Sequence, residues 1–342
     1  MILAVVFSTT IILSVLGMIF GRSDIEKQQG LTNIYDISTE GMIAYAVYES
    51  GQPGIYLQHD QEIFDNPILQ LDLDQEVLDM SFSPDGQSLA YVVSNKDKEV
   101  SIGSSVLLLE IETMEQKRLF GDQGLITEIS FDPKDADLLF YFRAGTFENY
   151  SPIASVHPHE FDLFSYCISD GEKIRHTEME QYSMRSLNVS PIDNAVFVQM
   201  DDDADVKTAE DIFETKQRIF RISIEQQEDI SVVSQRDRTT DIYDFAIVPN
   251  KNEVIFQSVS KTNKNGTFEY ELYHYNLENE QETQLTYLKE STSNPIISPQ
   301  SNKVFFMVDK QFGKKYADYH LYQMDMDGSN QKEVKLGGLV DE

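Results

Sequence analysis

One long insertion, residues 143–160, brings together side chains that could bind a metal. It contains His157 and His159, two of the six histidines, followed directly by Glu160. Imidazole nitrogens and a carboxylate are common ligands of divalent transition metals. Residues two apart face the same side only in a regular strand, and Pro158 interrupts the strand here. The sequence therefore favours histidines that cap backbone groups or meet solvent, and we assign no metal ligands.

A second cluster consists of four closely spaced carboxylates, Asp201, Asp202, Asp203 and Asp205. Calcium prefers such a density of oxygen ligands. The segment lacks the fixed alternation and the glycine of an EF-hand loop, so a solvated acidic loop is the favoured interpretation. The alternative is a calcium-stabilised structural domain, whose melting temperature would rise with calcium and fall with a chelator. No other cofactor is expected.

Catalytic motifs are absent from the sequence. No Gly-x-Ser-x-Gly elbow, His-Glu-x-x-His pair or glycine-rich phosphate loop occurs. The single cysteine, Cys167, lies in the apolar stretch Leu163–Ile168 and is interpreted as a small buried hydrophobe. One cysteine also excludes an internal disulfide. We therefore predict no catalytic residues.

The composition excludes one class of partner. The chain has 342 residues, with 27 Lys+Arg against 58 Asp+Glu, which gives a net charge of −31. So acidic a surface repels phosphate backbones and excludes nucleic-acid binding. The 41% apolar and 11% aromatic residues are enough to build a core.

The elements that must position these residues follow from a repeated turn. Its clearest copy is Ser83-Pro84-Asp85-Gly86, between the apolar stretches Val77–Ser83 and Ser88–Val93. Similar turns begin at positions 38, 83, 132, 190, 248 and 298, with spacings of 45, 49, 58, 58 and 50 residues. A second, more polar hairpin follows each of them. The pattern predicts an all-β chain, a six-bladed β-propeller with four-stranded antiparallel blades.

Two segments resemble a known repeat family. Ser83–Tyr91 and His320–Asn330 are similar to the TolB-type, "WD-repeat-like" propeller repeat, and the resemblance covers about residues 30–338. The Trp-Asp and Gly-His pairs of true WD repeats are missing, as is the separate N-terminal α/β domain of TolB. The resemblance implies an extracytoplasmic, protein-binding propeller of the bacterial cell envelope.

A membrane span is expected at the N-terminus. Residues 2–20 contain no charged side chain, and about 19 helical residues cover roughly 28 Å, close to the hydrocarbon thickness of a bilayer. We predict a transmembrane anchor at 1–22, a linker at 23–30, the propeller at 31–338 and a tail at 339–342. On the family resemblance, the propeller is placed outside the cytoplasm, as a monomer on a single-pass anchor.

The insertions of the repeats fall on one face of the predicted ring. Five of the six units extend the link between their second and third strands, and long loops in compact domains commonly bind partners. The sequence thus predicts a non-catalytic module that binds a protein or another envelope component. The alternatives are a propeller-type carbohydrate lyase or hydrolase and the calcium-stabilised domain. The expected binding residues are Phe147, Tyr150, His157, His159, Glu160, Asp201, Asp202, Asp203 and Asp205.

Overall fold

The computed structural model describes most of the chain beyond the N-terminal apolar run. It covers residues 25–339 except 60–65, 98–101, 146–157, 227–228 and positions 205, 209, 263, 265 and 299, together with six scattered residues between 7 and 17. The predicted anchor at 1–22 thus lies almost entirely outside the described residues. Among the residues that are described, no helix is long and apolar enough to cross a membrane.

Antiparallel strands make up the described structure, with one short 3-10 helix, η2 (Asp211–Glu214). Four sheets contain four strands each, consecutive in the chain. The first is β1 (Gly30–Ile37), β2 (Met42–Glu49), β3 (Gln52–His59) and β4 (Leu69–Gln70). The second is β5 (Gln75–Phe82), β6 (Ser88–Asn95), β7 (Ser104–Glu110) and β8 (Gln116–Asp122). The third is β9 (Ile126–Asp132), β10 (Asp135–Arg143), β11 (Asp162–Cys167) and β12 (Lys173–Arg175). The fourth is β13 (Met184–Val189), β14 (Ala195–Asp202), β15 (Lys216–Ser223) and β16 (Ile230–Val232).

The last two repeats join into one eight-stranded sheet, which the sequence did not predict. Its strands are β17 (Phe245–Ile247), β18 (Glu253–Thr262), β19 (Phe268–Asn276), β20 (Glu282–Gln284), β21 (Ser291–Ser298), β22 (Lys303–Asp309), β23 (Tyr319–Asp325) and β24 (Lys332–Glu333). The two halves meet at a single parallel bridge between Tyr270 and Ser291. Because β20 pairs only with Tyr273–Tyr275, the earlier part of β19 has an open edge that β21 reaches.

The repeated turns form as the sequence predicts. In the clearest copy the Ser83 hydroxyl donates to Asp85 and accepts the Ser88 amide, and Gly86 takes a positive φ of 71° that disfavours side chains. The copy without proline uses the same device, since the Ser38 hydroxyl accepts the Met42 amide at 3.0 Å. A serine hydroxyl therefore closes both of these hairpins, although only one of them contains proline.

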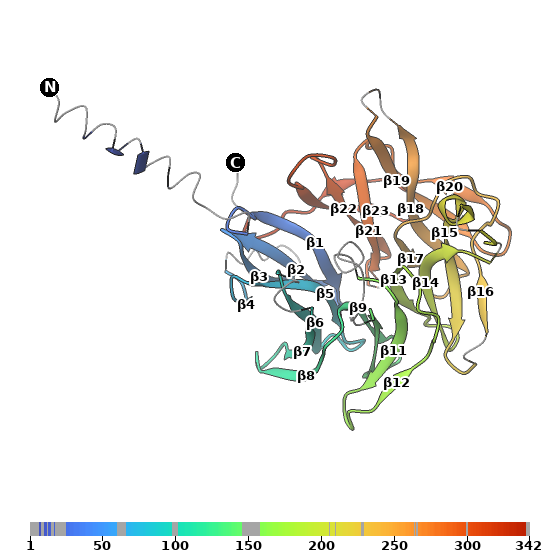
Figure 1. Ribbon diagram of the computed structural model, residues 1–342, viewed down its shortest axis with the longest axis horizontal. Coiled ribbons are helices and arrows are strands. Elements are labelled where there is room, and N and C mark those ends of the chain that lie inside the picture. Colours follow the sequence, from blue (N-terminus) through green and yellow to red (C-terminus); the bar gives the residue numbers. More distant parts are fainter. Residues whose placement is uncertain are drawn as a thin grey trace.

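The sheets are arranged around a common centre, with the first strand of each repeat innermost (Figure 1). Neighbouring first strands contact one another in the order β1, β5, β9, β13, β17, β21, and β21 returns to β1. Apolar clusters fill the interfaces between consecutive repeats, and one cluster joins Tyr45 and Tyr56 of the first sheet to Phe305 and Leu321 of the last. The described structure is therefore all-β, with the radial arrangement of a propeller.

Side-chain hydrogen bonds join the two ends of this ring, and no strand is exchanged between the first and last sheets in the part of the chain that the structure describes. Tyr35 donates to the Asn294 carbonyl at 2.6 Å, and Tyr45 donates to the Gly337 carbonyl at 3.1 Å. The buried Gln58 amide donates to the Lys335 carbonyl at 2.8 Å and accepts the Gly337 amide at 3.3 Å. The C-terminal segment thus packs on the first sheet although its strands pair only within the last.

Removing the Gln58 amide should loosen this closure. Gln58→Leu removes the partner of the buried Gly337 amide and of the Lys335 carbonyl, which costs about 1–3 kcal/mol and lowers the melting temperature by a few degrees. Thermal unfolding followed by circular dichroism measures the change. The control is Gln123→Leu on an exposed loop. Equal melting temperatures for both variants would refute the assigned role of Gln58.

Candidate functional site

A cavity of about 810 Å³ lies at the centre of the ring. The first strands of the repeats supply most of its lining, and the turn residues Ser83 and Pro133 contribute at one end. Pro158, Phe161 and Tyr182 contribute from the connections at the other end. The cavity therefore follows the first strands along most of their length.

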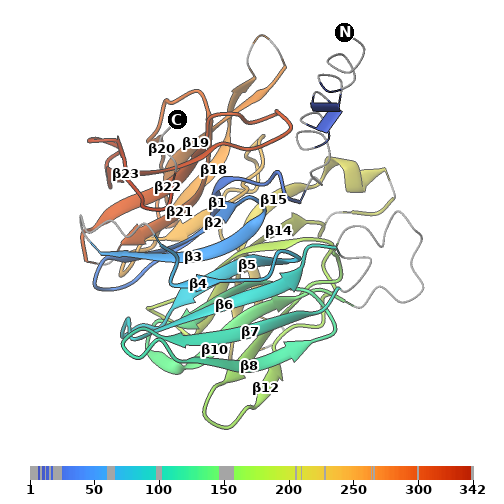
Figure 2. The ribbon, with the colours of Figure 1, turned by 90° about the vertical axis from the view of Figure 1, so that its left-hand side faces the viewer.

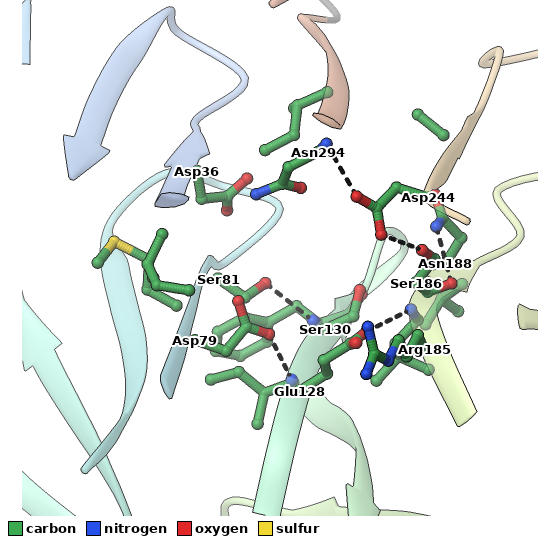
Figure 3. A pocket seen from close by; sticks show the side chains of 18 of the residues that line it. Asp36, Asp79, Ser81, Glu128, Ser130, Arg185, Ser186, Asn188, Asp244 and Asn294 are labelled. Atoms are coloured by element: carbon green, nitrogen blue, oxygen red, sulfur yellow. Dashed lines mark hydrogen bonds between the residues drawn. The ribbon is translucent and has the colours of Figure 1, made fainter. Parts of the chain in front are cut away.

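Polar side chains line this cavity at fixed distances from the repeated turns. Four residues before the turn come Asp79, Glu128, Ser186, Asp244 and Asn294 in successive repeats. Two residues before the turn come Asp36, Ser81, Ser130 and Asn188. Because alternate residues of a strand share one face, the two positions form two polar layers that point inward (Figure 3).

These side chains bond to the backbone of the next repeat around the ring. Asp36 accepts the Phe82 amide at 2.6 Å, and Asp79 accepts the Ile129 amide at 2.7 Å. Glu128 accepts the Leu187 amide at 2.8 Å. Asp244 accepts the Asn294 backbone amide at 3.2 Å, and Asn188 accepts the Ile247 amide at 3.3 Å. The Asn294 side chain donates to the Asn33 carbonyl at 2.8 Å, which links the last repeat to the first. Part of the polar lining therefore holds neighbouring repeats together.

Irregular backbone accompanies the polar layers. The pairing of the first strand shifts register next to Asp79, next to Ser186 and next to Asn294. Ser186 and Asn294 have positive φ values of 54° and 47°, a conformation that is uncommon for residues other than glycine. Bulges of this kind redirect side chains and occur often beside functional sites. In three repeats the bulge lies at the polar layer four residues before the turn.

Four carboxyl groups, Asp36, Asp79, Glu128 and Asp244, form what we call the carboxylate ring. Part of each side chain faces the cavity, but protein surrounds it on the other sides. Burial raises the pKa of both Asp36 and Glu128 to about 7. Burial, reinforced by the Glu128 charge, raises the pKa of Asp79 well above its usual value. Burial also raises the pKa of Asp244, opposed by the Asn294 amide and by Arg185.

Arg185 is the only Lys or Arg among the residues known to line the cavity. Its positive charge lowers the pKa of both Glu128 and Asp244, against the larger effect of burial. One guanidinium facing four carboxyl groups leaves the cavity short of positive charge. A ligand that brings an ammonium or guanidinium group would make up this deficit.

The sequence-predicted insertion ends beside this cavity. The Gly145 amide donates to the His159 carbonyl at 3.0 Å, and the His159 ring lies 6.3 Å from the Tyr182 ring at the cavity edge. Glu160 follows with a positive φ of 60°. Phe147, Tyr150 and His157 lie outside the described residues. The described end of the insertion therefore borders the cavity that the carboxylate ring lines.

The predicted aspartates lie elsewhere. Asp201 and Asp202 end β14, where Asp202 pairs with Arg236 at 3.4 Å, and Asp203 follows. None of the three lines the cavity. Among the described residues, no group of three or more His, Cys, Asp or Glu is placed to hold a metal ion, and Asp205 lies outside them. Calcium binding by this loop stays a prediction.

Sequence reasoning missed the carboxylate ring, although the sequence holds a signal for it. Asp79, Glu128 and Asp244 each come four residues before a turn. Each interrupts a stretch that was interpreted only as an apolar strand. Aligning the six turns would have placed these polar residues in register, and carboxyl groups in register on the innermost strands meet around the centre of the ring.

Comparisons with known proteins support the fold. The chain is similar to the crystal structure of TolB from Acinetobacter baumannii (14% identity, 94% of this chain and 68% of that chain, TM-score 0.57). It is also similar to the β-propeller domain of the Trilobed protease from Pyrococcus furiosus (12%, 91% and 85%, 0.53). A third is an oligogalacturonate lyase from Vibrio parahaemolyticus (12%, 87% and 79%, 0.56). No family model matches the chain. No curated protein matches it either. The similarities show a TolB-like β-propeller fold.

Proposed function

We propose that this protein is a non-catalytic binding module of the bacterial cell envelope, anchored by residues 2–20, whose central cavity receives a cationic segment of a polypeptide partner. The observation that supports it most is the carboxylate ring around a cavity of about 810 Å³ with Arg185 as the only Lys or Arg known to line it. Counting each half of the eight-stranded sheet as one blade gives six blades, because each half contains one repeated turn and four strands.

The size and position of the cavity favour a peptide segment over a free ion. Its volume falls within the range of about 300–1,000 Å³ typical of sites for organic ligands. The end of the longest insertion borders it through Pro158 and Phe161, so a chain that enters can also contact the loops of this face. The similarity to TolB adds the expectation of a protein partner outside the cytoplasm.

A sugar-cleaving function receives less support from the same cavity. An acidic sugar, such as the substrate class in the name of the Vibrio lyase, would meet four carboxyl groups and one guanidinium. The negative charge of the sugar and that of the ionised carboxyl groups repel each other, and this repulsion is stronger in a site that is partly shielded from water. The charge of the cavity therefore favours a cationic ligand.

Isothermal titration calorimetry with two capped tripeptides tests the proposal. Full-length protein in detergent is titrated with trilysine and with triglutamate at about pH 8, which is above the pKa of about 7 of Asp36 and Glu128. We expect heat of binding for trilysine alone. Equal affinities for the two peptides, or no binding of either, would contradict it.

A further inference from the structure

Two hairpin ends have a charge opposite to that of the rest of the chain. Residues 261–268, Lys-Thr-Asn-Lys-Asn-Gly-Thr-Phe, lie between β18 and β19, and residues 310–317, Lys-Gln-Phe-Gly-Lys-Lys-Tyr-Ala, lie between β22 and β23. We call these segments the basic tips. Together they contain five lysines and no carboxylate, in a chain of net charge −31.

The basic tips form one surface. The Phe312 ring meets the Tyr270 ring edge-on at 5.3 Å, and Tyr270 meets the Phe268 ring at 6.2 Å. A β-carbon placed at Gly313 would lie 3.5 Å from the Thr267 methyl group. Figure 2 shows β18 and β19 extending beyond the body of the ring. The aromatic side chains thus join the two tips at an outer corner of the molecule.

Exposed aromatic side chains accompany the lysines. Phe268, Phe312 and Tyr316 are 49%, 42% and 45% exposed. The described lysines of the tips, at positions 261, 264, 310, 314 and 315, are exposed as well. Carboxylates border the tips at their base: Glu269 lies opposite Lys261 in the hairpin, Asp309 and Asp318 flank the second tip, and Glu333 pairs with Lys310 at 3.1 Å. Basic and aromatic side chains side by side are the composition of surfaces that rest on anionic lipid headgroups.

The basic tips share a face with the start of the propeller. Ser50 and Gly51 form the link between the second and third strands of the first sheet, the same type of link as both tips. The Gly51 amide donates to the Gln28 carbonyl at 2.8 Å, and the Ser50 amide donates to the Gln29 side chain at 2.9 Å. Residues 28 and 29 are therefore held on the face from which the tips project.

A short tether follows from these contacts. The apolar run ends at Phe20 and the described chain resumes at Ile25, so four residues, 21–24, separate them. The five Cα-to-Cα steps from Phe20 to Ile25 reach at most about 17 Å when fully extended. If residues 2–20 span a bilayer, this face must lie close to its surface.

We infer that the basic tips dock on the anionic surface of the bilayer in which the protein is anchored. This rests on the membrane anchor of the proposed function but not on ligand binding in the cavity. Acidic loops such as Asp201–Asp203 on the same face are repelled by the same surface. The corner formed by β18, β19, β22 and β23 therefore contacts the bilayer surface, and the acidic loops lie farther from that surface.

Lysine acetylation on reconstituted full-length protein tests the inference. The protein is placed in nanodiscs of phosphatidylcholine alone or of phosphatidylcholine with phosphatidylglycerol, and mass spectrometry gives the acetylation rate of each lysine. We expect Lys261, Lys264 and Lys314 to react about fivefold more slowly in the anionic discs, an effect that high salt removes. Lys134 and Lys251, in repeated turns at the opposite face, serve as internal controls.

A pair of charge-reversal variants completes the test. Lys264→Glu with Lys314→Glu should abolish the lipid-dependent protection of Lys261, whereas Lys134→Glu with Lys251→Glu should leave it unchanged. Equal acetylation of the tips in both kinds of disc would overturn the inference and leave the anchor standing. Failure of the protein to enter nanodiscs at all would overturn both. Neither result bears on trilysine binding, which reports the cavity alone.

Discussion

Replacing Asp79 with Asn and Glu128 with Gln is expected to weaken trilysine binding at about pH 8 by 10–100-fold. Each substitution replaces a carboxyl group by an amide that cannot carry a negative charge and keeps a carbonyl oxygen that can accept the same backbone amide. The bonds to Ile129 and Leu187, at 2.7 and 2.8 Å, can therefore persist in the variant. The loss of affinity should come from charge and not from unfolding.

The matched control removes the same charge from the outside of the ring. Glu40→Gln with Glu112→Gln changes two exposed side chains in turns. This control should retain trilysine binding to within about twofold, because solvent screens charges that are separated by more than the Debye length. If both double variants lost affinity equally, binding would depend on total charge and the cavity would not be the site.

The pH dependence of binding provides an independent measurement of the same site. Asp36 and Glu128 have pKa values of about 7, so they bind protons as the pH falls below neutrality. A cationic ligand must displace these protons, and trilysine affinity should therefore rise between about pH 6 and pH 8. Calorimetry at pH 7 in buffers of different ionisation enthalpy should detect the released protons. The Asp79→Asn, Glu128→Gln variant should release fewer.

The sequence was sufficient to predict the local hairpins. Ser83-Pro84-Asp85-Gly86 forms the expected turn because its hydroxyl, carboxylate and glycine act within a few residues. The all-β class and the four-stranded repeats follow from the same short-range pattern. Closure of the ring does not, since the Gln58 amide bonds to Lys335, 277 residues away. No local pattern encodes such a contact.

In the candidate site, too, the local features could be predicted from the sequence and the features that depend on distant segments could not. The long insertion of residues 143–160 was noticed because its length and its histidines are local features, and its described end does border the cavity. The carboxylate ring was missed because its members, such as Asp79, lie one to a repeat and are far apart in the sequence. These carboxyl groups come together only in the folded chain, where six strands from distant parts of the sequence meet at the centre.

Lowering the pH from about 8 to about 6 is expected to stabilise the fold. Asp36 and Glu128 have folded-state pKa values of about 7, well above the values of about 4 in an unfolded chain. Between about pH 4 and pH 7 the folded state therefore binds more protons than the unfolded state, and the free energy of unfolding falls as the pH rises. The stabilisation is complete below the unfolded pKa and is lost as the pH rises through the folded pKa.

The size of the effect follows from the two carboxyl groups with the clearest shifts. Each group with a folded pKa of about 7 contributes roughly 1.4 kcal/mol between pH 8 and pH 6, because only the part of its titration around the folded pKa falls inside this window. Carboxyl groups with lowered pKa values, such as Asp85 and Glu253, act in the opposite direction but only as the pH approaches 4. Burial also lowers the pKa of His176, whose protonation on unfolding opposes the gain below about pH 6.5.

Urea unfolding at the two pH values, on the wild type and on Asp36→Asn with Glu128→Gln, separates these contributions. His176 contributes equally to both proteins, so the difference between them reports the two carboxyl groups. We expect the wild type to gain about 2–3 kcal/mol more than the variant on acidification, and the variant to be the more stable protein at pH 8. A wild type that loses stability between pH 8 and pH 6 in parallel with the variant would show that the carboxylate ring is already fully ionised. In that case the ring would offer its charge to a cation without releasing protons, and the pH dependence of trilysine binding would vanish with it.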